Sequence, residues 1–254
     1  MQTLKGRTCV FAGGTAGDGV EAVRELCRGG MNVVLMTNKP EKAAALIDSV
    51  HTDGFPGECT AISAQAGIIA EHCPETYAQI RERFGSVDVI VCNTGNNGVL
   101  APMEEVDGDQ LAGTLNQLVV GAYRMLLAAL PYLEQSRAPR VIFMTTPEGC
   151  RGGSQESFPN AVAKGALHAL TVNCAARTAA RGITVNCISK AGIPRVEPQP
   201  ANAPDPFVLL PHIPLKRMGT LQDMAQAVCF LASEESGYIT GQTLELNGGL
   251  HLGR

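Results

Sequence analysis

The stretch SFPNAVAKGAL, residues 157–167, combines a helical pattern with two polar side chains whose spacing could support chemistry. Asn160 and Lys164 are four residues apart, and side chains at i and i+4 lie on the same face of a helix. A lysine so placed commonly assists a neighbouring group that moves a proton. A primary amide does not titrate near neutral pH, so Asn160 can only orient a substrate, a water molecule or the lysine. The pair predicts a site whose proton carrier is not the amide.

A glycine-rich turn, GGTAGDG at residues 13–19, lies between a predicted strand and a predicted helix. Glycines there permit a tight turn and let backbone N–H groups approach a pyrophosphate, whose charge also suits a helix N-terminus. The spacing Gly13-x3-Gly17-x-Gly19 differs from the G-x-G-x-x-G fingerprint. The turn predicts a dinucleotide site near the start of the chain.

Short apolar runs alternate with longer amphipathic segments along the chain. The expected strands are at residues 8–12, 32–36, 59–63, 87–92, 140–145, 183–189 and 242–246. The expected helices are at residues 18–29, 40–50, 74–84, 104–133, 157–181 and 220–233. Apolar strands that alternate with helices are typical of a parallel sheet covered on both faces. The pattern predicts a doubly wound α/β fold that spans residues 1–254 as a single domain.

One segment departs from this alternation, because residues 194–214 hold seven of the fifteen prolines. Prolines remove backbone donors and fix φ, so the segment cannot form a long helix or a central strand. We interpret the region at about 190–216 as a long loop that acts as a lid or substrate loop.

The composition limits the partners and the compartment. A net charge of −4 gives no electrostatic reason to expect nucleic acid or an anionic membrane, so a small-molecule substrate is favoured. No apolar run approaches the roughly 20 residues of a membrane span, which predicts a cytoplasmic protein. The nine cysteines include no C-x-x-C pair and the histidines show no metal spacing. We therefore expect reduced, mostly buried thiols and no metal site.

Further motifs follow in order along the chain and carry a family resemblance. CNTG (92–95) follows the fourth expected strand, Lys164 lies in the long helix after the fifth, and residues 217–249 close the chain. With the Gly13/Gly17/Gly19 spacing, the sequence resembles the short-chain dehydrogenase/reductase family over essentially its full length. The resemblance implies a Rossmann-like sheet of seven parallel strands, NAD(H) or NADP(H), and hydride transfer to or from a carbonyl or alcohol. It also implies a homo-oligomer, either a tetramer or a dimer.

The resemblance further implies a catalytic group of Asn, Ser, Tyr and Lys, with Tyr four residues before Lys. Carried over, the lysine is Lys164 and the tyrosine position is Asn160. With Gly149 as the anchor, the serine position is Thr146, whose hydroxyl still donates a hydrogen bond. The asparagine position falls at Leu118. The candidate catalytic residues are therefore Thr146, Asn160 and Lys164, in a divergent member that lacks the active-site tyrosine.

Other positions also depart from the family pattern. Lys190-Ala191 stands where Pro-Gly is usual after the sixth strand, and Ala64 or Gln65 stands where an aspartate commonly contacts adenine. Asp18 replaces an aliphatic residue in the glycine turn. A carboxylate there should weaken dinucleotide binding unless it points away or is paired.

The cofactor contacts that the resemblance implies come mainly from the ends of the strands. They are Gly13, Thr15, Ala16, Gly17, Asp18, Gly19, Asn38, Lys39, Asn93, Thr94, Gly95, Lys164 and Ile193. After the second strand an acidic residue would bond the ribose of NAD and repel a 2′-phosphate. Here Thr37 and Asn38 are neutral and Lys39 is cationic, which favours NADP(H) over NAD(H).

Three functions remain open from the sequence. The protein is a reductase or dehydrogenase whose proton carrier is Lys164 itself, a water molecule, or Ser154, Ser157 or Cys150. Alternatively, it is a catalytically impaired relative that binds a nucleotide or a protein partner. In the third function, Lys164 acts as a base in non-redox chemistry. His168, one turn beyond Lys164, is expected to pack rather than react.

Overall fold

The computed structural model describes residues 2–63, 69–93, 101–154, 157–193 and 206–253. Its centre is a seven-stranded sheet in the order β3-β2-β1-β4-β5-β6-β7, with every pair parallel. The strands are β1 Thr8–Ala12, β2 Asn32–Thr37, β3 Cys59–Ser63, β4 Val89–Cys92, β5 Arg140–Thr145, β6 Thr184–Lys190 and β7 Thr243–Leu246. The Rossmann-like doubly wound fold expected from the apolar runs is confirmed.

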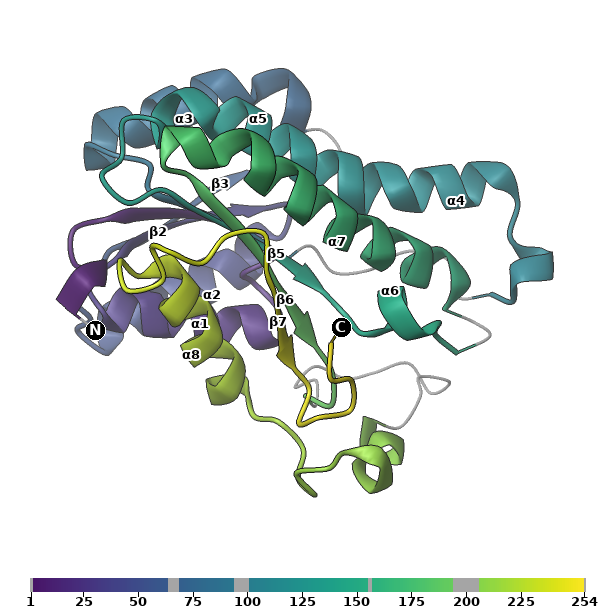
Figure 1. The fold of residues 1–254 in the computed structure, drawn as a ribbon. Helices are drawn as coiled ribbons and strands as arrows, with labels where there is room; N and C mark the ends of the chain where they lie inside the picture. Colours follow the sequence, from purple (N-terminus) through teal and green to yellow (C-terminus); the bar gives the residue numbers. More distant parts are fainter. Residues whose placement is uncertain (1, 64–68, 94–100, 155–156, 194–205, 254) are drawn as a thin grey trace.

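Helices cover both faces of the sheet (Figure 1). The helices on one face are α1 Asp18–Arg28, α2 Pro40–Thr52 and α8 Leu221–Ala232. Those on the other face are α3 Ile69–Phe84, α5 Gly121–Leu133 and α7 Phe158–Thr178. Because side chains alternate along a strand, Cys9 and Phe11 pack under α1 and α8, whereas Val10 and Ala12 pack under α3 and α5.

The helix expected at 104–133 is confirmed over residues 108–133, but it starts four residues later and contains a π-helical segment. A 3-10 turn, Met103–Glu105, comes first, and α4 Gly108–Leu115 then begins at a capping box in which Asp107 accepts from the Gln110 backbone N–H at 2.8 Å. A π-helical segment, Asn116–Val120, joins α4 to α5. Such segments frequently occur at functional sites.

Short helical elements complete the described chain. A 3-10 turn, Gln2–Leu4, precedes β1, and another, Ala179–Arg181, continues α7. The helix α6 Glu148–Arg151, absent from the sequence prediction, follows β5. A 3-10 segment, Pro206–His212, is the described part of the proline-rich loop, and residues 194–205 lie outside the described residues.

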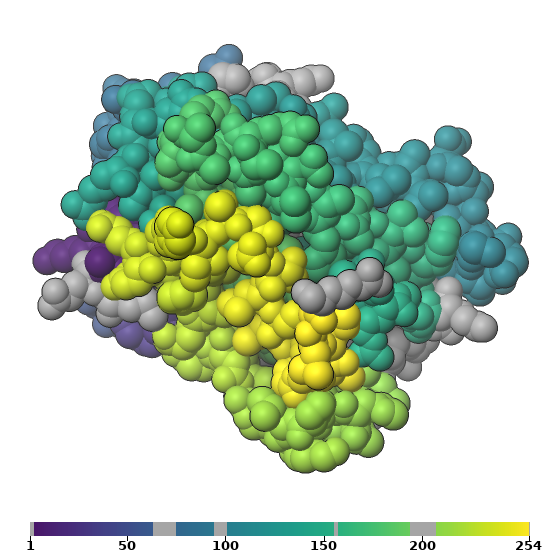
Figure 2. Space-filling view, in the orientation of Figure 1, coloured from purple at the N-terminus to yellow at the C-terminus, as the bar shows by residue number. Residues whose placement is uncertain are grey.

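The residues after β7 lie between α6 and the segment Pro206–His212, at the carboxyl edge of the sheet (Figure 2). The Arg151 guanidinium donates to the Leu250 carbonyl at 3.0 Å, and the Leu215 amide donates to the Gly248 carbonyl at 3.1 Å. The segment after β7 is thus hydrogen-bonded both to α6 and to the residues that follow the Pro206–His212 segment.

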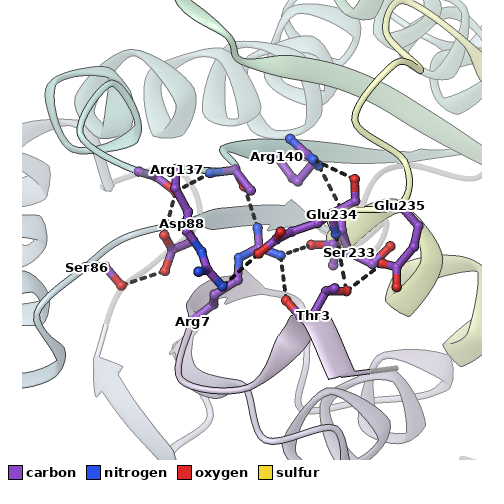
Figure 3. Close-up of polar contacts among 12 residues, drawn as sticks. Thr3, Arg7, Ser86, Asp88, Arg137, Arg140, Ser233, Glu234 and Glu235 are labelled. Atoms are coloured by element: carbon purple, nitrogen blue, oxygen red, sulfur yellow. Dashed lines mark hydrogen bonds and ion pairs between the residues drawn. The ribbon is translucent and has the colours of Figure 1, made fainter.

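A buried polar cluster fixes the opposite, amino edge of the sheet (Figure 3). Arg7 is 3% exposed and donates to the Ala232 carbonyl at 2.6 Å and to the Ala138 carbonyl. Asp88 accepts from the Thr8 amide at 2.8 Å. Burial lowers the pKa of Arg7, and the nearby Asp88 carboxylate opposes that shift. The cluster ties the end of α8 to the first strands.

Within the described ranges, no helix is both long and apolar enough to cross a membrane. Of the eight cysteines whose side chains the structure describes, seven are buried, as expected, and Cys150 is exposed.

Candidate active site

The glycine turn between β1 and α1 lies at the point where the strand order reverses, between β1 and β4. Gly13 and Gly17 have φ of 79° and 57°, which side-chain-bearing residues rarely adopt. A Cβ on Gly19 would collide with the carbonyl oxygen of Gly13. The turn therefore needs its three glycines, and in open α/β sheets ligands bind outside the carboxyl ends of the strands at this crevice.

Asp18, Asn93 and Lys190 form a closed polar triangle above this crevice. The Lys190 ammonium forms an ion pair with Asp18 Oδ2 and donates to Asn93 Oδ1 at 3.1 Å. Asn93 Nδ2 donates to Asp18 Oδ1 at 3.2 Å. Asp18, which the sequence analysis identified as an unfavourable charge near the diphosphate site, is thus paired with a cation. Thr94 and Gly95, expected to contact the cofactor, lie outside the described residues.

A second polar contact lies at the carboxyl end of β2. The buried hydroxyls of Thr15 and Thr37 are 3.2 Å apart, and Thr37 Oγ1 accepts from the Lys39 backbone N–H at 3.0 Å. The Asn38 and Lys39 side chains are exposed just beyond this contact. The glycine turn and the expected ribose-binding residues are therefore neighbours.

Lys164 and Asn160 lie one turn apart on α7, as the spacing predicts. The Lys164 ammonium donates to the Met144 carbonyl at 3.2 Å. Burial, and then the positive charge of Lys190, lower the pKa of Lys164 from 10.5 to about 8, although Glu148 and Asp18 oppose the shift. Asn160 is 5% exposed, and its Oδ1 is buried without a hydrogen-bond partner among the described residues.

Thr146 is held near Lys164 by a close backbone contact. A Cβ on Gly149 would collide with the backbone nitrogen of Gly165, the residue after Lys164. This contact packs α6 against α7 and so fixes the loop that carries Thr146. Thr146 Oγ1 lies 3.5 Å from Glu148 Oε2, a long contact that leaves the hydroxyl able to reorient.

Leu118 occupies the middle of the π-helical segment and is 1% exposed. Asn116, the nearest asparagine in the sequence, is exposed. The segment that packs against α7 therefore presents an aliphatic side chain at the position where the resemblance implies an asparagine.

The other candidate proton carriers differ in exposure. Ser154 and Cys150 are exposed, whereas Ser157 is buried and its hydroxyl donates to the Ser154 carbonyl at 3.0 Å. The His168 ring contacts the hydroxyl of Thr243 at 3.0 Å, and burial lowers its pKa. The His168 ring is thus held by contacts within the fold, and the packing role expected for it stays a prediction.

The remaining expected contact, Ile193, is partly buried against the segment that follows the proline-rich loop. A Cβ on Gly219 would lie 2.9 Å from Ile193 Cγ1, and the Gly219 amide donates to the Gly192 carbonyl at 2.8 Å. These contacts hold the chain just after the proline-rich loop against the start of that loop.

Two features of the site were missed by sequence reasoning. The partnership of Lys190 with Asp18 joins residues 172 positions apart, and its only signal was that two unusual charges of opposite sign follow strand ends. The Met144 carbonyl, which accepts from Lys164, carries no signal in a sequence because every residue has a carbonyl.

Comparisons with known proteins agree with this geometry. A family model described as Enoyl-(Acyl carrier protein) reductase matches residues 14–251. The 3-oxoacyl-(acyl-carrier-protein) reductase of Staphylococcus epidermidis is 30% identical over 250 residues, 97% of this chain and 99% of the relative. The 7alpha-hydroxysteroid dehydrogenase of Clostridium sardiniense is 28% identical, with 100% and 96% covered.

Solved structures match over the same length. An NADH-dependent reductase responsible for alginate metabolism has a TM-score of 0.87 at 26% identity, with 100% of both chains covered. A mutant short-chain dehydrogenase/reductase of Serratia marcescens has a TM-score of 0.87 at 26% identity, with 98% and 99% covered. The chain therefore belongs to the short-chain dehydrogenase/reductase family of oxidoreductases.

Proposed function

We propose that the protein reduces a small carbonyl compound, or oxidises the corresponding alcohol, with NADP(H) and with Lys164 as the proton carrier. The observation that carries this proposal is the partly buried Lys164, whose pKa is about 8, beside an amide that cannot titrate. A general acid is most effective when its pKa lies near the working pH, so this ammonium is a far better donor than an ordinary lysine.

The residues at the carboxyl edge of the sheet fit a dinucleotide. The glycine turn leaves no room for a side chain at Gly19 and leads directly into the N-terminus of α1, which suits a diphosphate. On this proposal Gly13, Gly17 and Gly19 hold the diphosphate region, and Thr15 and Asn38 hold the adenosine ribose. The bound cofactor supplies or accepts the hydride.

The preference for NADP(H) rests on the exposed Lys39. Its cationic side chain follows β2 directly, with neutral Thr37 and Asn38 before it, and a cation there attracts a 2′-phosphate. The solved reductase of alginate metabolism is NADH-dependent, so a similar structure does not by itself imply NADP(H). A change of charge at residue 39 is therefore the natural test of this preference.

The proton moves between Lys164 and the substrate oxygen. In the reducing direction the Lys164 ammonium gives one proton to the oxygen as the carbonyl carbon accepts the hydride, and the neutral amine then regains a proton from solvent. Asn160 Oδ1, which has no hydrogen-bond partner in the described parts of the chain, can accept a hydrogen bond from the ammonium, a water molecule or a substrate hydroxyl. The Thr146 hydroxyl can donate to the substrate oxygen. On this proposal Asn160 stands at the family's tyrosine position and orients rather than titrates.

The substrate enters beside the proline-rich loop at about 190–216, of which the structure describes the two ends. Phe207 and Val208 on its second part are more than half exposed, which suits an apolar part of a substrate. On the outer faces of α5 and α7, Leu127 and Val172 are also exposed. We propose that these helices pack against other copies of the chain in a dimer or tetramer.

Titration with NADPH and with NADH, followed by nicotinamide fluorescence, tests the proposal. The chain has no tryptophan, so protein emission does not overlap the signal. We expect NADPH to bind more tightly, and reduction of a generic diketone to be lost in Lys164→Met. If neither dinucleotide binds at millimolar concentration, the proposed function is wrong and the impaired, nucleotide- or protein-binding alternative is favoured. If Lys164→Met retains full reductase activity, another group carries the proton.

A further inference from the structure

The ion pair between Asp18 and Lys190, together with Asn93, joins the ends of β1, β4 and β6 across the dinucleotide crevice. Asp18 begins α1 directly after the glycine turn, Lys190 ends β6, and Asn93 follows β4. In the sheet β5 lies between β4 and β6, so the Lys190 side chain reaches over the end of β5 to meet the other two residues. The pair therefore spans the edge at which ligands of such sheets bind.

The burial of these groups makes the pairing energetically significant. The side chains of Asp18 and Lys190 are 14% and 22% exposed, so each charge is largely removed from water. Asn93, 7% exposed, satisfies both charged groups through its amide and is anchored by its backbone N–H to the Ala12 carbonyl at 2.9 Å. Removing one partner of such a pair leaves an uncompensated charge, whereas removing both does not.

The position of the pair indicates what the two charges face. Asp18 is the first residue of α1, directly after the N-cap residue Gly17, and a helix N-terminus favours an anion. A diphosphate bound at this turn would be repelled by Asp18 and attracted by Lys190. The two side chains are in contact, so they exert opposite electrostatic forces on such a ligand from nearly the same place.

We propose that Lys190 is the cation that receives the cofactor diphosphate in this chain, and that Asp18 is its internal competitor. This inference rests on the proposed function. In the ligand-free protein Asp18 and Asn93 hold the Lys190 ammonium in place. A bound diphosphate shares that ammonium with Asp18, so the pair sets the affinity for the dinucleotide and keeps it lower than Lys190 alone would allow.

A double-mutant cycle tests the inference through NADPH binding rather than activity. Asp18→Asn keeps the shape and removes the competing charge, so NADPH should bind about tenfold more tightly and with a steeper dependence on salt. Lys190→Met leaves Asp18 unpaired, and binding should weaken by about tenfold or more. The double variant should return to within about threefold of the original affinity because the two single effects have opposite signs and nearly cancel.

Controls separate this electrostatic role from a merely structural one. Lys190→Arg retains the cation and should keep NADPH affinity within about threefold, with a shallow salt dependence like that of the original chain. Lys5→Met and Asp48→Asn make the same changes of charge at exposed positions and should leave the affinity unchanged. Inorganic pyrophosphate, used as a competitor, should compete best against the Asp18→Asn variant.

The outcomes distinguish the inference from the proposed function. If the original chain binds NADPH but neither single variant shifts the affinity beyond threefold, the inference is overturned and the proposed function stands. If only Asp18→Asn binds NADPH, the inference is supported and the proposed function fails for the native chain. If none of the four proteins of the cycle binds NADPH or pyrophosphate, Lys190 is not a diphosphate site and the inference is overturned together with the proposed function.

Discussion

The lowered pKa of Lys164 predicts how the stability of the protein changes with pH. The pKa of Lys164 is about 8 in the folded chain, against 10.5 for an unperturbed lysine. Between these two values the unfolded chain binds more protons than the folded chain, so the free energy of unfolding rises as the pH increases. Each pKa unit corresponds to about 1.4 kcal/mol, and the lysine therefore costs on the order of 3 kcal/mol at neutral pH. That cost is released between about pH 8 and pH 10.5.

The variant Lys164→Met isolates this contribution. The variant also loses the hydrogen bond to the Met144 carbonyl, so the informative quantity is how the difference in unfolding free energy between the two proteins changes with pH. Relative to the variant, the original chain should gain on the order of 3 kcal/mol in unfolding free energy from pH 7 to pH 10.5. Urea denaturation followed by circular dichroism measures it, because the chain has no tryptophan to report by fluorescence.

Lys5→Met, at an exposed position on the opposite edge, should give a difference that is flat over the same pH range. A flat or falling difference for Lys164→Met would refute the lowered pKa, and with it the argument that Lys164 can serve as a proton donor near neutral pH.

Three further predictions concern neighbouring parts of the site. Asn160→Tyr should raise diketone reductase activity by restoring a titrating hydroxyl beside Lys164, and should lower the melting temperature because residue 160 is buried; no gain in activity would mean that the pocket cannot accept the ring. Gly149→Ala should destabilise the protein by about 1–3 kcal/mol in chemical denaturation. As a control, Gly113→Ala, in an exposed turn of α4 with open space for a Cβ, should stabilise it by a few tenths to about 1 kcal/mol. Equal effects of the two substitutions would contradict the close contact of α6 with α7. Lys39→Glu should reverse the preference for NADPH over NADH in competitive titrations, and an unchanged ratio would mean that residue 39 does not meet the 2′-phosphate.

Most of the fold follows from patterns that are local in sequence. Each strand of the sheet is a short apolar run, and burial on both faces makes such runs easy to find. The start of the long helix expected at 104–133 was misplaced, because the apolar periodicity begins before the capping residue at which the helix actually starts. The contact of Asp107 with Gln110 starts a new helix at Gly108, and periodicity does not register such a start.

The candidate site was predictable where spacing along one element decides it. Asn160 and Lys164 share a helix face by helical geometry, and the glycine turn follows from the close packing of α1 on β1. The pairing of Asp18 with Lys190 could not be predicted, because it depends on how far β1 and β6 are separated across the sheet. The low pKa of Lys164 depends on burial, which no spacing reveals.

The buried cluster at the amino edge of the sheet has a consequence for how this protein can tolerate change. Asp88 precedes β4 and Asn93 follows it, so the cluster that secures the strands and the crevice that meets a ligand are separated by about 15 Å along one short strand. Anchorage is thereby concentrated at the end of the strands remote from the chemistry. Replacements of Asp18 or Lys190 should therefore alter ligand binding at the crevice while the cluster around Arg7 and Asp88 still anchors the strands.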